Sequence, residues 1–475
     1  MTRTARVVGS ALLTVVLAAG AYLTADAYDF VPGIVTLAPL LPPPPPFPTA
    51  PGAILPASAP PVLPDLQANA PVPDGDAVSR LISRAASDKR LGPSVGAIVI
   101  DQATGAVISQ VDASGLRTPA STVKLLTAVA ALGVLGSESH FTTRVVRGAR
   151  PGEIVLVGGG DLLLAAGAGD VTKTNGHAGL ADLAAGAAHA LRLSGSSTVR
   201  VRLDDLLFTG PAVSPTWQPA YLTNGFVAPV APLEVNIGKL RDEEYPPRQP
   251  DPALSAARVF ADALAAQGIT IDGAVARGAA ASGAATIASV DSAPVREVVT
   301  YALQTSDNTV TEALGRMVAV KSGFAASFDG ATKGVLAHLT ALGVATSGAQ
   351  LADCSGLGDG TRVSARLLAD LLLLATNPAH PEYRPVALDL PVAGMSGTLA
   401  DRFTTSGARG VVRAKTGSLP GVTSLAGTIL DADGRLLVFA MIADQTPPGG
   451  QTGPRLVIDS LVDSLAGCGC RAGSG

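Results

Sequence analysis

The sequence predicts a mixed α/β (α+β) fold, in which helices flank an antiparallel sheet and a β-rich region separates two parts of the chain. Residues 411–419, 424–430 and 436–443 have the composition of consecutive antiparallel strands. Between residues 141 and 285, strand-like pieces alternate with Gly-rich turns. Apolar residues recur with helical spacing in several further stretches: 77–88, 295–303, 309–320, 363–374 and 454–466.

Length and composition indicate a globular protein with two or three domains. The chain has 475 residues, of which 47% are apolar, so it can bury substantial cores. Only 15% of residues are charged and the net charge is −4, which excludes the basic footprint of a nucleic-acid-binding protein. The cysteines and histidines show no disulfide framework and no metal-ligand spacing, so we expect no metal site.

Residues 1–27 have the pattern of an export signal. Arg3 and Arg6 precede a nearly uncharged apolar run at residues 7–23, and Ala25-Asp26-Ala27 offers a small-x-small cleavage pattern. The run is at the short limit for a membrane span, so cleavage and retention as an N-terminal membrane attachment both stay open. Either outcome predicts an exported protein in the periplasm or cell envelope, on the outer side of the cytoplasmic membrane.

Residues 28–75 are predicted to form a Pro-rich linker. Five consecutive prolines stand at residues 42–46 and more follow. Such a segment favours extended polyproline II and acts as a semi-rigid spacer. The folded part begins near Asp76, and residues 96–100 and 106–111 predict the first β-hairpin.

Ser121 and Lys124 lie three residues apart at the start of a predicted helix. This spacing places both side chains on one helix face, so the amine can reach the hydroxyl. A serine hydroxyl needs a neighbouring base to become a nucleophile. Lysine can be that base only if burial and nearby cations lower its pKa from about 10.4 toward roughly 7 to 8. Alone, however, the pair more often marks a capping serine followed by a solvated lysine.

Ser306-Asp307-Asn308 interrupts a helical region with three polar residues. In an extended loop, Ser306 and Asn308 would point the same way while Asp307 turns back. Asn308 can donate to and accept from a peptide amide, and Ser306 can relay a proton. Taken alone, the tripeptide is typical of a polar surface loop.

Lys415-Thr416-Gly417-Ser418 falls within a predicted strand. Strand alternation puts Thr416 and Ser418 on one side, and Lys415 and Gly417 on the other. The two hydroxyls and the cation suit a carboxylate. We expect Gly417 to leave room where a side chain would block the cleft.

In this order, Ser-x-x-Lys, Ser-x-Asn and Lys-Thr-Gly resemble the signature of penicillin-binding proteins and serine β-lactamases. Each motif alone is weak evidence for this family, and the three motifs in this order are strong evidence. Flanking segments narrow the resemblance to the serine-type D-alanyl-D-alanine carboxypeptidase/endopeptidase family of class C low-molecular-mass penicillin-binding proteins. These segments are residues 156–161, 203–211, 353–357, 390–394, 397–399 and 415–427.

The resemblance implies a penicillin-binding-protein/serine β-lactamase-like catalytic domain, at residues 76–140 and 286–475, interrupted by an inserted accessory domain at residues 141–285. Lys124 and Ser306 are about 180 residues apart, which is too far for a class A β-lactamase and fits an insertion. The insert carries none of the three motifs, so we expect it to shape access rather than perform chemistry. The chain departs from the family at Cys354, where Gly is usual, and at Ser418, where Thr is frequent.

The resemblance also implies a mechanism on peptidoglycan peptides ending in D-Ala-D-Ala. Ser121, deprotonated by Lys124, would form an acyl-enzyme, and Ser306 would pass a proton to the leaving D-Ala. The substrate-binding residues would be Asn308, Lys415, Thr416, Gly417 and Ser418. Backbone N–H groups of Ser121 and Ser418 would form the oxyanion hole, where one donor contributes about 3 kcal/mol. No cofactor is implied, and β-lactams would inhibit by acylating Ser121.

Two other functions share the motifs. A serine β-lactamase would need fast deacylation, and the chain shows no clear Glu-x-x-x-Asn loop of the class A type. A non-turnover penicillin-binding scaffold would not need Ser121, Lys124, Ser306, Asn308 and Lys415 together. Carboxypeptidase and endopeptidase activities use the same chemistry, and the motifs do not separate them.

Overall fold

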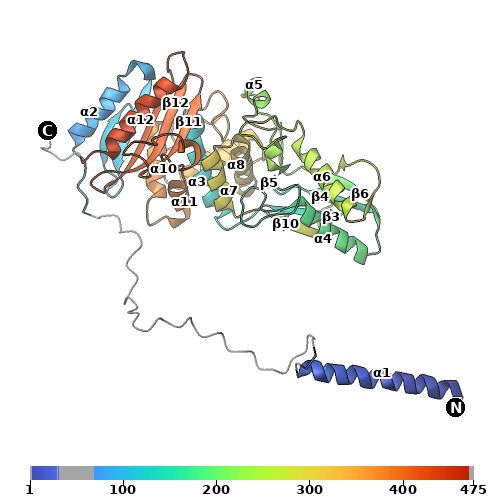
Figure 1. Cartoon of the computed structure of the whole chain (residues 1–475). Coiled ribbons are helices and arrows are strands. Elements are labelled where there is room, and N and C mark those ends of the chain that lie inside the picture. Colours follow the sequence, from blue (N-terminus) through green and yellow to red (C-terminus); the bar gives the residue numbers. More distant parts are fainter. Residues whose placement is uncertain (1–2, 29, 32–68, 470–475) are drawn as a thin grey trace, which may run out of the picture. The chain divides into compact units, whose positions relative to one another are not determined.

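The computed structural model describes residues 3–28, 30–31 and 69–469 (Figure 1). The chain divides into two compact units, Met1–Pro64 and Asp65–Gly475. In the first unit, α1 (Arg3–Ala27) covers the predicted signal segment. Most of the predicted Pro-rich linker, residues 32–68, lies outside the described residues. No helix within the described ranges is long and apolar enough to cross a membrane.

The first sheet of the second unit has five antiparallel strands in the order β11-β12-β13-β1-β2. The predicted consecutive strands near the C-terminus are confirmed, and β13 pairs with β1 from the start of the unit. The bounds are β1 (Val95–Asp101), β2 (Val107–Val111), β11 (Val412–Leu419), β12 (Val422–Leu430) and β13 (Leu436–Ala443).

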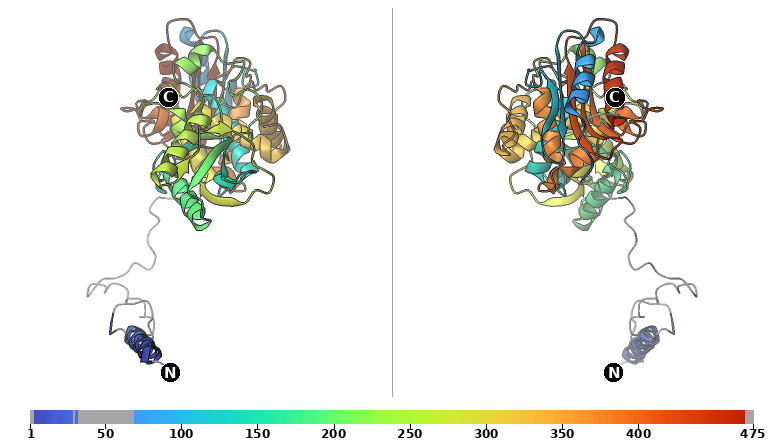
Figure 2. Two further views of the ribbon diagram at one scale, coloured as in Figure 1. Left: turned by 90° about the vertical axis from the view of Figure 1, so that its right-hand side faces the viewer. Right: turned by 90° about the vertical axis from the view of Figure 1, so that its left-hand side faces the viewer.

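Helices cover both faces of this sheet, which explains why β1 is buried along its whole length. Val99 faces a core shared with α2 (Gly75–Ala86) and α12 (Thr452–Ala466). Ile98 faces the opposite core, shared with α3 (Lys124–Leu135) and α10 (Ala365–Ala375). The right panel of Figure 2 shows α2 in blue and α12 in red, side by side on their face.

A group of helices surrounds α3, whose residues from Lys124 to Leu132 are all buried. Three of them, α7 (Val295–Thr305), α8 (Asn308–Ser322) and α9 (Phe328–Ala341), pack against α3. Of the short elements, η2 (Ala120–Val123), η4 (Pro381–Tyr383) and α11 (Arg384–Leu388) contribute to this core. In contrast, η1 (Lys89–Leu91) and η5 (Gly397–Leu399) contribute to the core shared with α2 and α12.

The second sheet lies in the predicted inserted region, shown in green in Figure 1. Its strand order is β10-β3-β4-β6-β8, with β9 also paired to β6. The bounds are β3 (Thr142–Arg147), β4 (Glu153–Val157), β6 (Thr198–Asp204), β8 (Thr270–Ile271), β9 (Ala276–Arg277) and β10 (Thr286–Asp291). Because β10 pairs with β3, the sheet continues past the expected boundary at residue 285.

Two helices, α4 (Leu180–Leu193) and α6 (Pro252–Ala266), share a separate core with this sheet. They connect parallel strands, since β4 pairs with β6 and β6 with β8 in parallel. Parallel pairing needs such crossover connections, so the region is mixed α/β rather than purely β-rich.

The middle of the inserted region packs against α8 and α9 rather than in the core of the second sheet. Phe208, Trp217 and Tyr221 belong to a fourth cluster, together with Ala313 of α8 and Phe328 of α9. The remaining elements here are β5 (Asp161–Leu164), α5 (Pro219–Thr223), β7 (Leu233–Val235) and η3 (Asn236–Gly238). The division into catalytic and inserted domains stays a prediction, since residues 65–475 form one compact unit.

Candidate active site

Ser121 lies in η2, immediately before α3 begins at Lys124. The Lys124 Nζ atom lies 2.8 Å from the Ser121 Oγ atom. The predicted reach of the amine to the hydroxyl is therefore present. The residue before the serine, Ala120, has a positive φ of 50°, an uncommon conformation for a residue with a side chain. This kink is where the chain turns into the helix.

The Lys124 amine is fully enclosed by three oxygen acceptors. Besides Ser121 Oγ, it donates to Asn308 Oδ1 at 2.6 Å and to the Ser355 carbonyl at 2.9 Å. The residue is 1% exposed. Burial lowers the pKa of Lys124 to about 8, against the opposing effect of the Asp353, Asp307 and Glu312 carboxylates. Roughly a tenth of the amine is therefore neutral at pH 7, far more than for a lysine in water, as a general base requires.

The Ser306-Asp307-Asn308 segment is not the extended loop that the sequence predicted. Ser306 is left-handed, with φ 56°, and caps the C-terminus of α7. Asp307 is the N-cap of α8 and accepts from the Val310 N–H, and Asn308 is the first residue of α8. A tight helix–helix turn thus replaces strand alternation, yet Asn308 still faces Lys124 while Asp307 turns away.

Lys415 reaches the same place from β11. Its Nζ atom donates to Ser306 Oγ at 2.8 Å and to the Thr416 carbonyl at 3.0 Å. The residue is 0% exposed. Burial, and then the charge of Lys124, lowers the pKa of Lys415 well below its usual value. The three motifs therefore converge on one cluster of two amines, two hydroxyls and an amide.

Thr416 and Ser418 are half-buried and alternate with the buried Lys415 and Gly417, as strand periodicity predicted. Thr416 Oγ1 donates to Thr398 Oγ1 at 2.9 Å. Arg455, an exposed residue of α12, donates from Nη2 to Ser418 Oγ at 3.1 Å. Sequence reasoning missed Arg455 because no motif links α12 to this strand.

The expected reason for Gly417 is wrong. A Cβ atom there would lie 2.1 Å from Ser424 Oγ and 2.5 Å from the Pro119 carbonyl. The space is thus filled by the neighbouring strand and by the chain leading into η2. Gly417 allows β11 to pack closely against the Ser121 segment, and its role is not to open a cleft.

Glu312 and Asp353 are two buried acids that sequence reasoning did not place in the site. Glu312 accepts from the backbone N–H groups of Cys354 and Ser355, at 3.1 Å and 2.8 Å. Asp353 accepts from Trp217 Nε1 at 2.7 Å. Together they orient the segment whose Ser355 carbonyl binds Lys124. Glu312 follows Asn308 by one helical turn, which is the signal that could have indicated it.

Cys354 is a free, buried cysteine whose side chain packs against α8. A Cβ atom on Gly315 would lie 2.3 Å from its Sγ atom, so the thiol occupies the space over that glycine. Burial raises the pKa of the Cys354 thiol well above its usual value, which makes it unreactive. Cys468 is disulfide-bonded, and Cys470 lies outside the described residues.

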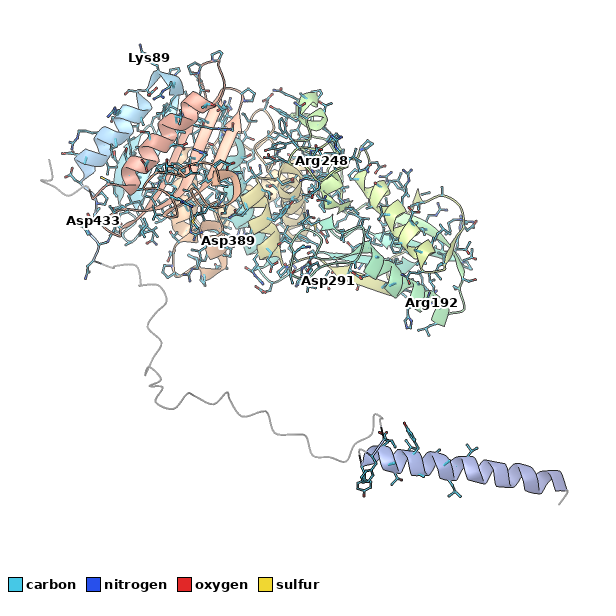
Figure 3. The ribbon with its side chains drawn as sticks, viewed as in Figure 1. Lys89, Arg192, Arg248, Asp291, Asp389 and Asp433 are labelled. Atoms are coloured by element: carbon cyan, nitrogen blue, oxygen red, sulfur yellow. The ribbon has the colours of Figure 1, made fainter. Side chains whose placement is uncertain are left out.

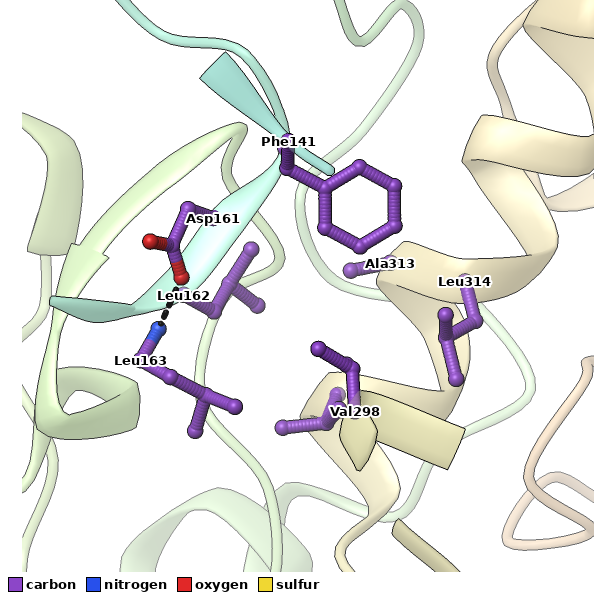
Figure 4. A pocket seen from close by; sticks show the side chains of 9 residues that line it. Phe141, Asp161, Leu162, Leu163, Val298, Ala313 and Leu314 are labelled. Atoms are coloured by element: carbon purple, nitrogen blue, oxygen red, sulfur yellow. Dashed lines mark hydrogen bonds between the residues drawn. The ribbon is translucent and has the colours of Figure 1, made fainter. Parts of the chain in front are cut away.

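A separate small pocket lies between β5 and the helices α7 and α8 (Figure 4). Asp161, Leu162 and Leu163 face Val298 and Leu314 across it. Burial raises the pKa of Asp161 to about 7, and its carboxylate accepts from the Leu163 N–H at 2.8 Å. The motif residues are not part of this lining. In the described parts of the chain, no group of three or more His, Cys, Asp or Glu side chains could hold a metal ion.

The chain is similar to several known proteins. The model of the D-Ala-D-Ala carboxypeptidase 3 (S13) family matches residues 78–250 and 242–464. Carboxypeptidase DacB of Mycolicibacterium smegmatis is 36% identical over 97% of this chain and 96% of its own. The D-alanyl-D-alanine carboxypeptidase of Actinomadura sp. is 29% identical over 79% of this chain and 81% of its own. Penicillin-binding protein 4 (dacB) of Haemophilus influenzae shares the fold, with a TM-score of 0.68 at 20% identity over 82% of this chain and 99% of its own.

Proposed function

The chain belongs to the D-Ala-D-Ala carboxypeptidase 3 (S13) family of serine hydrolases, and on this premise we propose that Ser121 is its nucleophile and Lys124 its general base. The observation that carries the proposal is the buried Lys124 amine, 2.8 Å from the Ser121 hydroxyl and with a pKa lowered to about 8. The substrate is the D-Ala-D-Ala end of a peptidoglycan stem peptide.

The reaction proceeds through an acyl-enzyme. Lys124 takes the hydroxyl proton while Ser121 Oγ attacks the carbonyl carbon of the penultimate D-Ala. Backbone N–H groups of Ser121 and Ser418 stabilise the oxyanion. Ser306, held by Lys415, relays the proton that Lys124 has taken to the leaving D-Ala nitrogen as the peptide bond breaks, so that Lys124 is neutral again for deacylation. Water then attacks the ester, releasing the shortened peptide and restoring the Ser121 hydroxyl.

The substrate's terminal carboxylate lies at the β11 end of the site. Thr416 and Ser418 offer hydroxyls on the less buried side of the strand, and Lys415 approaches from the buried side, where a bound carboxylate would favour its charged form against the effect of burial. Arg455 supplies an exposed cation beside Ser418. Asn308, held by Lys124, is available to the substrate amide. This arrangement favours a peptide with a free C-terminus.

We further propose that the protein is exported and works in the periplasm or cell envelope. The charged start and apolar run of residues 1–27 support export, and the Pro-rich stretch at residues 28–75 supports a spacer. Retention of the N-terminal segment would attach the enzyme to the outer side of the cytoplasmic membrane. β-Lactams, as strained analogues of the D-Ala-D-Ala bond, act as inhibitors that acylate Ser121.

One experiment tests the proposal. The purified protein is incubated separately with a cell-wall pentapeptide, a cross-linked peptide dimer and penicillin. We expect D-Ala release from the pentapeptide and a slowly hydrolysed penicillin adduct that peptide mass mapping assigns to Ser121. Cleavage of the dimer would add D,D-endopeptidase activity. Rapid penicillin turnover without D-Ala release would identify a β-lactamase instead, and labelling that survives Ser121→Ala would overturn the mechanism.

A further inference from the structure

The inserted region contacts the Ser306–Asn308 turn directly. The Asn308 Nδ2 atom donates to the Phe226 carbonyl at 2.9 Å. The Ala228 N–H donates to Thr309 Oγ1, also at 2.9 Å. Because Asn308 Oδ1 binds Lys124, the Phe226 carbonyl determines which end of the Asn308 amide faces the general base.

Arg248 organises this contact from within the inserted region, where it meets α8 (Figure 3). Its Nε and Nη2 atoms donate to the Gly225 carbonyl at 3.1 and 3.0 Å, one residue before Phe226. Its Nη1 atom donates to the Ile237 carbonyl at 2.9 Å. The Arg248 side chain is 4% exposed, so the guanidinium has left water almost completely.

A buried guanidinium needs a counter-charge, and Asp307 provides it. Arg248 Nη2 lies 3.7 Å from Asp307 Oδ2, and the Asp307 side chain is 9% exposed. The other nearby acid is Glu234, whose Oε2 atom is buried without a hydrogen-bond partner. Burial raises the pKa of Glu234 well above its usual value, which favours its neutral form, and the ion pair that the structure shows joins Arg248 to Asp307.

We propose that Arg248 is a positioning residue for the reaction: from the inserted region it holds Asp307 and the Gly225–Phe226 backbone, and thereby fixes the amide of Asn308 against Lys124. The inference rests on the proposed function, because it assigns Arg248 a task only if Lys124 is the general base. It also gives the inserted region a part in catalysis that the motifs do not indicate.

The ion pair has an electrostatic consequence for Lys124. The Asp307 carboxylate favours the charged form of Lys124, as Asp353 and Glu312 also do. Arg248 offsets the Asp307 charge and so helps to keep the base neutral. Other titratable groups face these charges from the surrounding elements. Lys415 faces Lys124. Asp307 is faced by Glu234, Tyr245 and Tyr301.

The test compares Arg248→Gln and Arg248→Lys with the parent, using Arg202→Gln as the matched control. Arg202 is a partly buried arginine of β6 in the same inserted region, and its Nε atom pairs with Glu153 at 3.1 Å. The second-order rate constant for acylation of Ser121 by penicillin is measured across pH by mass spectrometry. Thermal unfolding of each variant is recorded alongside.

We expect Arg248→Gln to reduce acylation by about tenfold or more, since charge-assisted hydrogen bonds to the turn are lost. The pH at which acylation reaches half its maximum should rise, because the Asp307 charge is then unopposed. Arg248→Lys keeps the positive charge but loses the several hydrogen bonds of the planar guanidinium. The acylation rate constant should therefore fall, while the pH of half-maximal acylation stays near that of the parent. Arg202→Gln should match the parent in both.

Parent-like rates and pH midpoint in a folded Arg248→Gln variant would overturn the inference, as would an equal loss in Arg202→Gln. If Arg248→Gln does not fold, Arg248→Lys and Asp307→Asn provide the test instead. An asparagine at residue 307 can still cap α8. Asp307→Asn should lower the pH midpoint, and an unmoved midpoint would count against the coupling. A parent that is not acylated at Ser121 would instead refute the proposed function.

Discussion

At the scale of single residues, the site depends on two lysines that the fold removes from water. Lys124 has three oxygen acceptors and a pKa lowered to about 8 by burial. Lys415 is equally buried and binds Ser306. Burial favours the neutral amine that the proposed base Lys124 requires, while the contact of Lys415 with a hydroxyl suits a proton relay.

The lowered pKa of Lys124 predicts how acylation depends on pH. Since the base must be neutral, the rate constant for acylation of Ser121 should rise with pH and level off above about pH 8. Lys124→Arg should acylate about 100-fold slower or worse, because a guanidinium stays protonated. Stopped-flow or mass-spectrometric acylation rates at constant ionic strength provide the measurement. A pH-independent rate, or an active Lys124→Arg variant, would rule out Lys124 as the base.

Lys415 is predicted to read the substrate's terminal carboxylate with Thr416 and Ser418. Lys415→Ala should reduce kcat/KM on a D-Ala-D-Ala peptide by about 10- to 150-fold. Amidating the peptide's C-terminus should harm the parent strongly and this variant much less, because the partner charge is already absent. Kinetics on the four enzyme–substrate combinations form a double-mutant-style cycle.

Arg455→Gln, measured in the same cycle, identifies which cation touches the carboxylate. Arg455 is exposed beside Ser418, whereas Lys415 is buried against Ser306. If the losses simply add for Lys415 but not for Arg455, the carboxylate binds Arg455. Lys415 would then act through Ser306 alone.

At the scale of elements, the site depends on how closely β11 approaches the segment before α3. Strand β11 pairs with β12 along its length, and Ser424 of β12 donates to the Pro119 carbonyl at 2.6 Å. The same carbonyl lies where a Cβ atom of residue 417 would stand. The small residue in the Lys-Thr-Gly motif therefore keeps β11 beside Ser121.

Gly417→Ala should destabilise the protein by about 1–3 kcal/mol and slow acylation, since the new methyl group would collide with the Pro119 backbone carbonyl as well as with the Ser424 hydroxyl. Chemical unfolding and the acylation rate measure the two effects. Gly407→Ala is the control, because its nearest neighbour to an added Cβ atom lies 3.9 Å away. Equal stability and activity in both variants would show that β11 can move away without consequence.

At the scale of the whole molecule, the inserted region has two parts that pack differently. Its sheet, with α4 and α6, has a core of its own. Its middle part packs against α8 and α9, where Trp217 meets Phe328 edge-on with ring centroids 5.1 Å apart. Arg316 of α8 also lies over the Phe328 ring and donates to the Pro211 carbonyl at 2.8 Å.

Replacing residues 141–285 with a short linker should therefore abolish folding or acylation, because it removes the Phe226 carbonyl, Arg248 and one side of the Trp217 cluster. Phe260→Ala is the comparison, since Phe260 is buried within the separate core of the inserted sheet. It should cost about 3–5 kcal/mol of stability in that core while the folded protein still acylates. A folded deletion variant acylated at the parent rate would show that the inserted region only shapes access.

Much of the fold and of the candidate site could be predicted from sequence because the signals are local. Strand alternation predicted that Lys415 and Thr416 point to different faces of one strand, and the structure shows this. The three-residue spacing of Ser121 and Lys124 predicted the contact between amine and hydroxyl, which is also present. These patterns depend on the 2.0 and 3.6 residue periods of strands and helices, which any stretch of chain carries by itself.

Contacts between segments that are distant in the chain were decided only by the tertiary structure. The left-handed turn at Ser306, the crowding at Gly417 and the ion pair between Arg248 and Asp307 follow no local period. They arise because a buried charge or a tight turn is tolerated only where packing from elsewhere supplies its partners. The sequence by itself therefore determined which residues are candidates for the chemistry, and packing determined what holds them in place.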